Sequence, residues 1–132
     1  MNGTSEYLLL FRGTGGNKNL SPEEMQKQAE KFMAWFERLR LEGKCKGGQP
    51  LQPEGRLVSG KGGRHVVDGP FAESKEAIGG YFSLTVGDLD QAVEIAKGCP
   101  GLDYGLQVEV RPIADMCPIL KQAEERLAHA MA

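Results

Sequence analysis

The chain is poor in the residue types that most often perform catalysis or bind metals. Its 132 residues include only two histidines, His65 and His129, and three cysteines, Cys45, Cys99 and Cys117. The cysteines are odd in number and far apart, and no C-x-x-C pair occurs, so their spacing offers neither a zinc knuckle nor a redox motif. We therefore expect three reduced, mostly buried thiols, no metal site and no cofactor.

The sequence also lacks a strong charge excess and a long apolar run. The formal net charge is -2 and the pI is about 5.7, which argues against the basic surface of a general nucleic-acid binder. No apolar segment approaches the length of a membrane span, and residues 1–6 lack the pattern of a signal peptide. We expect a single cytoplasmic domain over residues 1–132, without direct nucleic-acid binding or membrane contact.

The clearest helical pattern covers residues 21–42. Ser21 suits the N-cap, Pro22 suits the first helical position, and Glu24 can close a capping box. Gly43 then suits the C-terminal cap. An apolar stripe at helical spacing indicates that this helix lies on a sheet; it consists of Met25, Ala29, Phe32, Phe36 and Leu39.

Four segments are predicted to form the main strands. Residues 7–12 and 81–86 have apolar side chains on both faces, which is typical of strands covered on both sides. Residues 106–111 alternate cleanly, whereas residues 44–51 are a weaker strand because of their glycines and prolines. Between them, residues 56–59 and 64–68 flank a glycine-rich turn and predict a β-hairpin.

Two further helices are expected after these strands. Asp88 suits the N-cap of the first, with Gln91 as its capping partner, and Pro100 follows its end. Residues 117–131 form an amphipathic C-terminal extension beyond a core of about residues 5–113. The apolar side of that extension needs a covering surface, either from its own domain or from a second subunit.

The order of elements predicts an α+β fold. Without the hairpin it is strand, helix, strand, strand, helix, strand, which is the ferredoxin-like split βαβ plan with both helices on one face of an antiparallel sheet. The other face still carries apolar residues, and an apolar sheet face left in water would be a large exposed patch. We therefore predict a homodimer that pairs two sheets face to face.

One motif resembles a known family. DGPFAE at residues 68–73, followed by GGYF at residues 79–82, is similar to the signature of the DGPF branch of the YCII-related family, and the match runs in order over most of the chain. The resemblance independently implies a dimeric α/β barrel. Most of that family has no assigned activity, and DGPF proteins are often found beside, or joined to, sigma factors of the extracytoplasmic-function type.

The resemblance does not carry over an acid–base mechanism. Better-studied members of the wider family are associated with a His–Asp pair, and the aligned positions here hold Phe32 and a residue near Gln52. His65 and Asp68 could form such a pair. However, residues three apart on a strand point to opposite faces, so a structural or surface His65 is favoured and both remain weak catalytic candidates.

The candidate binding residues surround the signature turn. Asp68 and Glu73 could face a cleft, whereas an Asx-turn is the alternative role of Asp68. Arg12 and Arg111 end strands predicted to be neighbours and would favour an anionic ligand, or else they pair with Glu109 and Glu73 in solvated salt bridges. Two aromatic residues complete the predicted site: Phe71 and Tyr81.

These observations support three functional hypotheses. The first is a homodimer that binds a small anionic or aromatic molecule in a cleft near the DGPF turn. The second is a non-enzymatic accessory protein linked to sigma-factor transcription control, although the chain has no DNA-binding motif. The third is a cofactor-free enzyme of the lyase or oxygenase kind.

Overall fold

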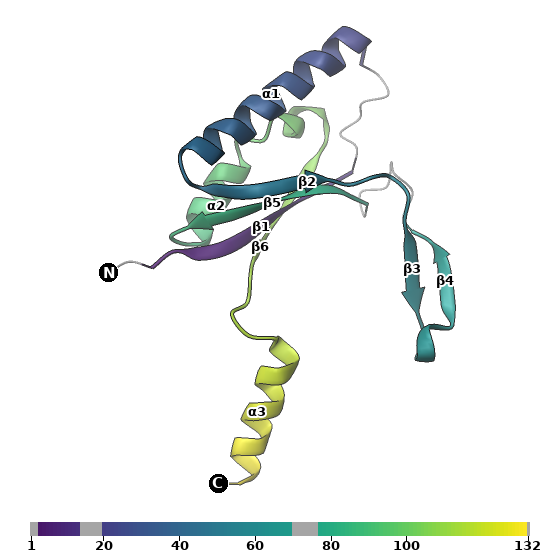
Figure 1. Cartoon of the computed structure of the whole chain (residues 1–132), viewed down its shortest axis with the longest axis vertical. Coiled ribbons are helices and arrows are strands. Elements are labelled where there is room, and N and C mark those ends of the chain that lie inside the picture. The colour runs from purple at the N-terminus through teal and green to yellow at the C-terminus, as the bar shows by residue number, and fades with distance from the viewer. Residues whose placement is uncertain (1–2, 14–19, 70–76, 132) are drawn as a thin grey trace.

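The computed structural model describes residues 3–13, 20–69 and 77–131. These residues form helices, strands and two short 3₁₀ turns (Figure 1). In chain order the elements are β1 (Ser5–Arg12), α1 (Pro22–Leu41), β2 (Cys45–Pro50), β3 (Arg56–Ser59), η2 (Lys61–Gly63), β4 (His65–Asp68), β5 (Ile78–Val86), α2 (Leu89–Ala96), η3 (Pro100–Tyr104), β6 (Gln107–Pro112) and α3 (Pro118–Ala130).

The main sheet has four strands in the order β2-β5-β1-β6, and every neighbouring pair is antiparallel. Apart from the inserted hairpin, β2 and β5 follow one another in the chain and pair in the sheet, whereas β1 lies between β5 and β6, as the split βαβ plan requires. The predicted α+β, ferredoxin-like class with an extra hairpin and a C-terminal helix is confirmed. The hairpin, β3 paired with β4, forms a separate two-stranded sheet.

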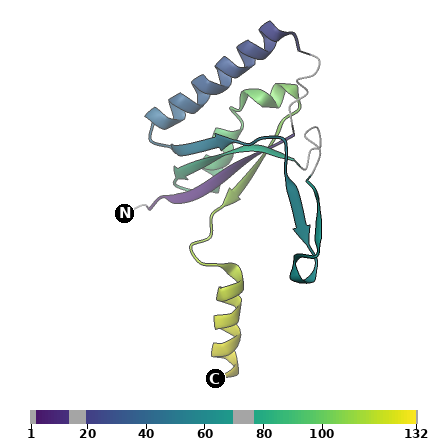
Figure 2. The same cartoon turned by 45° about the vertical axis from the view of Figure 1, so that its right-hand side comes forward.

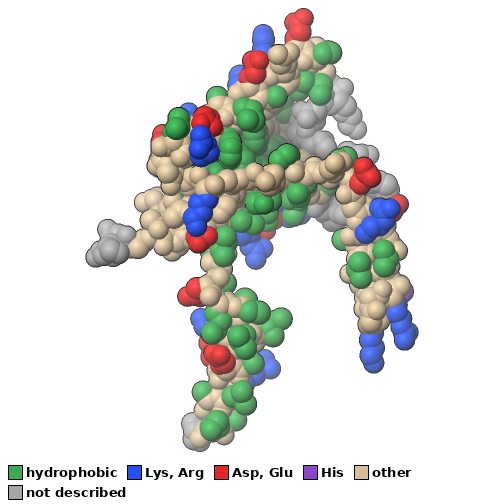
Figure 3. All heavy atoms as spheres, in the orientation of Figure 1, with side chains coloured by type: hydrophobic (Ala, Val, Ile, Leu, Met, Phe, Trp, Pro, Cys, Tyr) green, Lys and Arg blue, Asp and Glu red, His purple; other side chains and the backbone are tan. Residues whose placement is uncertain are grey.

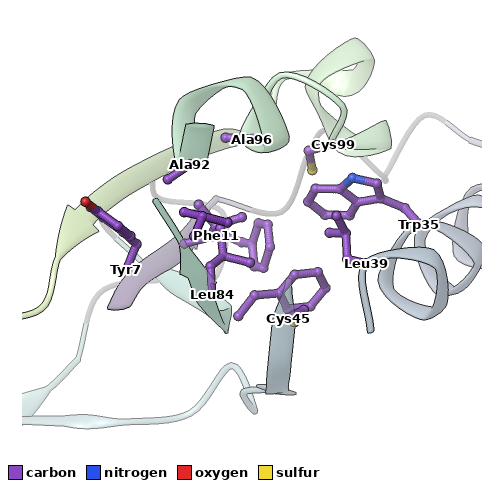
Figure 4. Close-up of a cluster of buried hydrophobic side chains, with 12 residues drawn as sticks. Tyr7, Phe11, Trp35, Leu39, Cys45, Leu84, Ala92, Ala96 and Cys99 are labelled. Carbon is purple, nitrogen blue, oxygen red and sulfur yellow. The ribbon is translucent and has the colours of Figure 1, made fainter. Parts of the chain in front are cut away.

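Helices α1 and α2 cover one face of the main sheet. Strand alternation places Leu9 of β1 and Leu84 of β5 on that face, and both are completely buried. Trp35 and Leu39 of α1 belong to the same core cluster, and Figure 4 shows them together with Leu84. The other buried apolar side chains of this core are Tyr7, Phe11, Cys45, Phe82, Val86, Ala92, Ala96 and Cys99.

The start of α1 follows the predicted capping chemistry. The Glu24 amide donates to the Ser21 hydroxyl at 3.1 Å, and the Ser21 amide donates back to the Glu24 carboxylate at 3.1 Å. Pro22 occupies the first turn, where its missing N–H leaves no bond unmade. The capping hydrogen bonds also lower the pKa of Glu24. This helix is therefore fixed at its N-terminus by local sequence alone.

The second face of the sheet is not covered by α1 or α2. It carries Leu8 and Leu10 of β1, and Tyr81 and Ser83 of β5, all half-exposed. Strands with two apolar faces are expected to be covered on both sides. Within the described part of a single chain, only the face that carries α1 and α2 is covered. The predicted pairing of two sheets stays a prediction for this face.

Cys45 and Cys99 are buried, which raises the pKa of both thiols, and Cys117 is exposed. No three His, Cys, Asp or Glu side chains among the described residues lie close enough together to hold a metal ion. Of the described helices, none has the length and apolar character needed to cross a bilayer. The 3₁₀ turn η3 (Pro100–Tyr104), between α2 and β6, is an addition to the predicted elements.

Truncating the core at Leu84 tests this arrangement. We expect Leu84→Ala to lower the free energy of unfolding by about 2–5 kcal/mol, because the lost apolar contacts leave a cavity between the sheet and its helices. Urea denaturation measures this loss. Leu41→Ala is the control, because Leu41 is 76% exposed at the end of α1. A similar loss in both variants would contradict the assignment of the core.

Candidate functional site

A cavity of about 600 Å³ lies between α1 and the end of the sheet formed by β2 and β5. Its size falls within the range usual for small-molecule sites. The described residues that line it come from β1, α1, β2, β5, η3 and the loops beside them. They are Phe11, Gly13, Gln28, Phe32, Met33, Phe36, Gly48, Gln49, Pro50, Gly79, Gly80, Tyr81, Phe82, Gly101, Tyr104 and Leu106.

Two glycines explain why this end of the helix-covered face is not filled. Gly48 pairs with Phe82, and Gly80 pairs with Phe11, so both glycines occupy positions that face α1. A Cβ on Gly48 would lie 2.5 Å from the Phe82 ring, and one on Gly80 would lie 2.9 Å from the Gln49 carbonyl oxygen. The strands therefore approach too closely here for side chains, and the space above them stays open.

Aromatic rings form the inner wall of the cavity. Phe32 and Phe36 lie one helical turn apart on α1, and both face Phe82 of β5, with ring centroids 5.6 Å and 4.9 Å away. Phe11 packs edge-on against Phe32 at 5.3 Å and against Phe82 at 4.9 Å. Edge-to-face packing of this kind fixes the ring orientations, so the wall is pre-formed.

Polar groups are few in the wall. Gln28 and Gln49 carry amide side chains, and Tyr104 carries a phenol. None of the described lining residues is Asp, Glu, Lys, Arg, His or Cys. A charged molecule would therefore lose its hydration without gaining a counter-charge from these residues. The described wall suits an uncharged, mainly apolar or aromatic molecule that makes a small number of hydrogen bonds.

The predicted arginine pair lies elsewhere. Arg12 of β1 donates to the Glu109 carboxylate of β6 at 2.5 Å, and Arg111 donates to the same carboxylate at 3.1 Å. The hydrogen bond from Arg12 and then that from Arg111 lower the pKa of Glu109. Register places all three residues on the sheet face opposite to α1. The structure therefore contains the alternative predicted from the sequence, in which both arginines form salt bridges with Glu109.

The hairpin carries the two weak catalytic candidates. The Asp68 carboxylate is 85% exposed and lies 3.3 Å from Arg56, its cross-strand neighbour. His65 pairs with Ser59 on the other face of the hairpin, as the three-residue spacing predicts. The structure therefore does not bring His65 and Asp68 together, and it places neither of them in the cavity wall.

The remaining predicted binding residues divide into two groups. Phe71 and Glu73 lie outside the described residues. Tyr81 does belong to the cavity wall, although strand alternation directs its side chain to the opposite face. Phe32, which the sequence-based prediction places at the family histidine position, also lines the cavity, whereas Gln52 is exposed beyond β2. An apolar ring thus occupies the place where the resemblance would put an acid–base group.

Sequence reasoning missed Gln28, Met33 and Tyr104. The helical pattern on residues 21–42 does carry a signal for the first two, because they lie beside Phe32 and Phe36 on one side of α1. Tyr104 belongs to the unpredicted turn η3 and gives no signal of its own. The glycines on two neighbouring strands are a second clue, although in sequence they indicate only a weak β2 strand.

Comparison with known proteins identifies the family. Residues 6–117 match the model of the YCII-related domain. The chain belongs to the YCII-related family. That model describes the family as a whole, so membership of the DGPF branch stays a prediction.

Two individual proteins are similar to this chain at a lower level. Over 50 residues it is 38% identical to the uncharacterized protein R00369 of Rhizobium meliloti (strain 1021). That alignment spans 37% of this chain and 40% of the relative. Among solved structures, a hydroxynitrile lyase from Passiflora edulis aligns with 89% of this chain and 100% of its own, at 15% identity and a TM-score of 0.38. Similarity at this level says nothing about the activity of this chain.

The ion-pair cluster on the open sheet face predicts a specific pH dependence. The folded-state pKa of Glu109 is depressed, so its contribution to stability is present above the unfolded-state pKa and disappears as pH falls through the folded-state value. We expect the stability difference between wild type and Glu109→Gln, measured by urea denaturation, to shrink as the solution is acidified over this range. A difference that stays constant with pH would contradict the assignment.

A carboxyl NMR titration separates the two arginines. The Arg12 hydrogen bond is the larger cause of the depressed pKa of Glu109. We therefore expect Arg12→Gln to raise that pKa more than Arg111→Gln does. The reverse order would show that Arg111 is the main partner.

Proposed function

We propose that this YCII-related protein binds a small, uncharged, mainly apolar or aromatic molecule in the cavity between α1 and the sheet. The observation that carries the proposal is the composition of the described wall, in which rings of Phe11, Phe32, Phe36 and Phe82 meet two amides and the phenol of Tyr104. An aromatic ligand gains from apolar burial and from edge or face contacts with these rings.

The same wall favours binding over turnover. General acid–base or nucleophilic catalysis needs a titratable or nucleophilic group within hydrogen-bond reach of the reacting atoms. Among the described lining residues, the only such groups are the phenols of Tyr104 and Tyr81, and alternation directs the Tyr81 side chain to the other face. The described part of the cavity is thus built as a receptor for an apolar molecule.

The position of the two arginine side chains favours a ligand without charge. Arg12 and Arg111 are held by Glu109 on the other side of the sheet, so they supply no counter-charge to the cavity. Of the two ligand classes considered from the sequence, the aromatic class fits the described residues. A neutral phenol or naphthol should therefore bind in preference to a benzoate or naphthoate of the same shape.

Matched neutral and anionic probes test this preference. Trp35 is the single tryptophan of the chain and packs against Phe32 and Phe82, so its fluorescence reports on the cavity wall. We expect 2-naphthol to change the Trp35 signal, or to raise the melting temperature, at concentrations where 2-naphthoate does not. Tighter binding of the carboxylate would contradict the proposed ligand class.

A charged residue at the cavity wall tests the location. Met33 lines the cavity and is 62% exposed, so Met33→Arg is expected to fold normally. We expect it to weaken naphthol binding roughly tenfold or more, because the guanidinium would have to lose water when an apolar ligand enters, at a cost of about 1.4 kcal/mol for each factor of ten. Calorimetry measures the change.

Met25→Arg is the matched control. Met25 lies on the same helix, is 45% exposed, and is not among the described residues that line the cavity. Its variant should bind naphthol as wild type does. Equal affinity in both variants would place the binding site elsewhere, and failure of wild type to bind any probe of this class would refute the function itself.

A further inference from the structure

Two segments extend away from the folded core (Figures 1 and 2). We name residues 51–68, which contain β3 and β4, the hairpin arm. We name residues 113–131, which contain α3, the helical arm. Every residue of both arms is exposed in the single chain. None of the described residues that line the cavity belongs to either arm, so the role of the arms is independent of the proposed ligand.

The hairpin arm has apolar side chains on both faces. The register pairs Val58 with Val66 on one face and Leu57 with Val67 on the other. These four side chains are 50–65% exposed. A two-stranded hairpin is only marginally stable in water without a surface to pack on. The composition of this arm therefore indicates that it is covered on both faces in the functional protein.

The helical arm has an apolar stripe with no described partner. Leu120, Ala123, Leu127 and Ala130 recur at spacings of three and four residues, which places them on one side of α3. Leu120 is 52% exposed and Leu127 is 63% exposed. Figure 3 shows hydrophobic side chains gathered along this helix and on the hairpin arm.

The total surface shows how much cover is missing. The accessible surface of the chain is 9823 Å² for a mass of 14.4 kDa. A compact monomer of this mass would expose about 6,800 Å², so the chain carries an excess of about 3,000 Å². Two copies together carry about 6,000 Å² of excess, which is the same order as the roughly 2,000–5,000 Å² or more that obligate homodimers bury in total.

We propose that the hairpin arm and the helical arm embrace a second copy of this chain. The chain's own α3 has a single apolar stripe, which could cover at most one face of the hairpin and would leave the other face in water. A second copy provides another helical arm and another open sheet face at once. Both arms leave the sheet on the side away from α1, beside the face that carries Leu8 and Leu10 (Figures 1 and 2).

This proposal goes beyond the pairing of two sheets. It assigns the apolar residues of both arms to the interface, so that each copy holds its partner by segments outside its own core. In a closed two-fold dimer, the same set of contacts is made twice, so both arms of both copies are buried against the partner. The dimer should therefore depend on residues of the arms as well as on the sheet.

Charged substitutions in each arm test the proposal on the full chain. The hairpin variant is Val58→Lys with Val66→Lys, and the helical variant is Leu120→Lys with Leu127→Lys. We expect wild type to be a dimer at micromolar concentration by analytical ultracentrifugation. Each double variant should raise the dissociation constant at least tenfold, because lysines would be buried without counter-charges. Unchanged circular dichroism and Trp35 fluorescence would show that the core remains folded.

Leu41→Lys is the matched control. Leu41 is 76% exposed and apolar, but it lies at the end of α1 and outside both arms, so its variant should dimerise as wild type does. A monomeric wild type would overturn the proposal, and so would double variants that dimerise as tightly as the control. Hydrogen exchange gives a measurement without substitutions: the amides of β3, β4 and α3 should become more protected as protein concentration rises, and protection independent of concentration would overturn the proposal.

Discussion

The whole structure depends on how α1 is held against one face of a four-stranded sheet. Phe82, near the middle of β5, packs against four rings at once, with centroids 4.9–5.6 Å away. This contact sets the distance between helix and strands. Because α1 and α2 both lie on that face, the opposite face and the two projecting segments are left with apolar groups that the described residues of a single chain do not cover.

The cavity is a consequence of the same packing. Where β2 and β5 carry glycine on the helix-facing side, no strand side chain fills the space beside the ring cluster, so the contacts that such a side chain would make are absent. Such a space costs stability when it is empty. A ligand that binds only the folded state returns part of that stability by mass action. The ring cluster and the cavity beside it therefore both result from the way α1 packs on β2 and β5.

Local chemistry makes much of the fold predictable. The Ser21 cap, the alternation of residues 106–111 and the order of elements depend on neighbours in sequence, and they indicate the sheet order without reference to tertiary contacts. The site is less accessible to such reasoning. The order of elements makes β1 and β6 neighbours and so predicts the Arg12–Glu109 ion pair as one alternative, whereas Asp68 leaves the core only because the hairpin does. Gly48 and Gly80 shape the cavity through strand pairing, which no local pattern contains.

The cavity-facing side of α1 can vary without disturbing the rest of the fold. Gln28, Phe32, Met33 and Phe36 face the cavity from the middle of a helix whose start is secured by its own cap and whose far end is anchored by the buried Leu39. Exchanges at these four positions would change the shape and polarity of the cavity while leaving strand pairing untouched. The backbone can therefore stay the same while a few helical side chains decide what the cavity could hold.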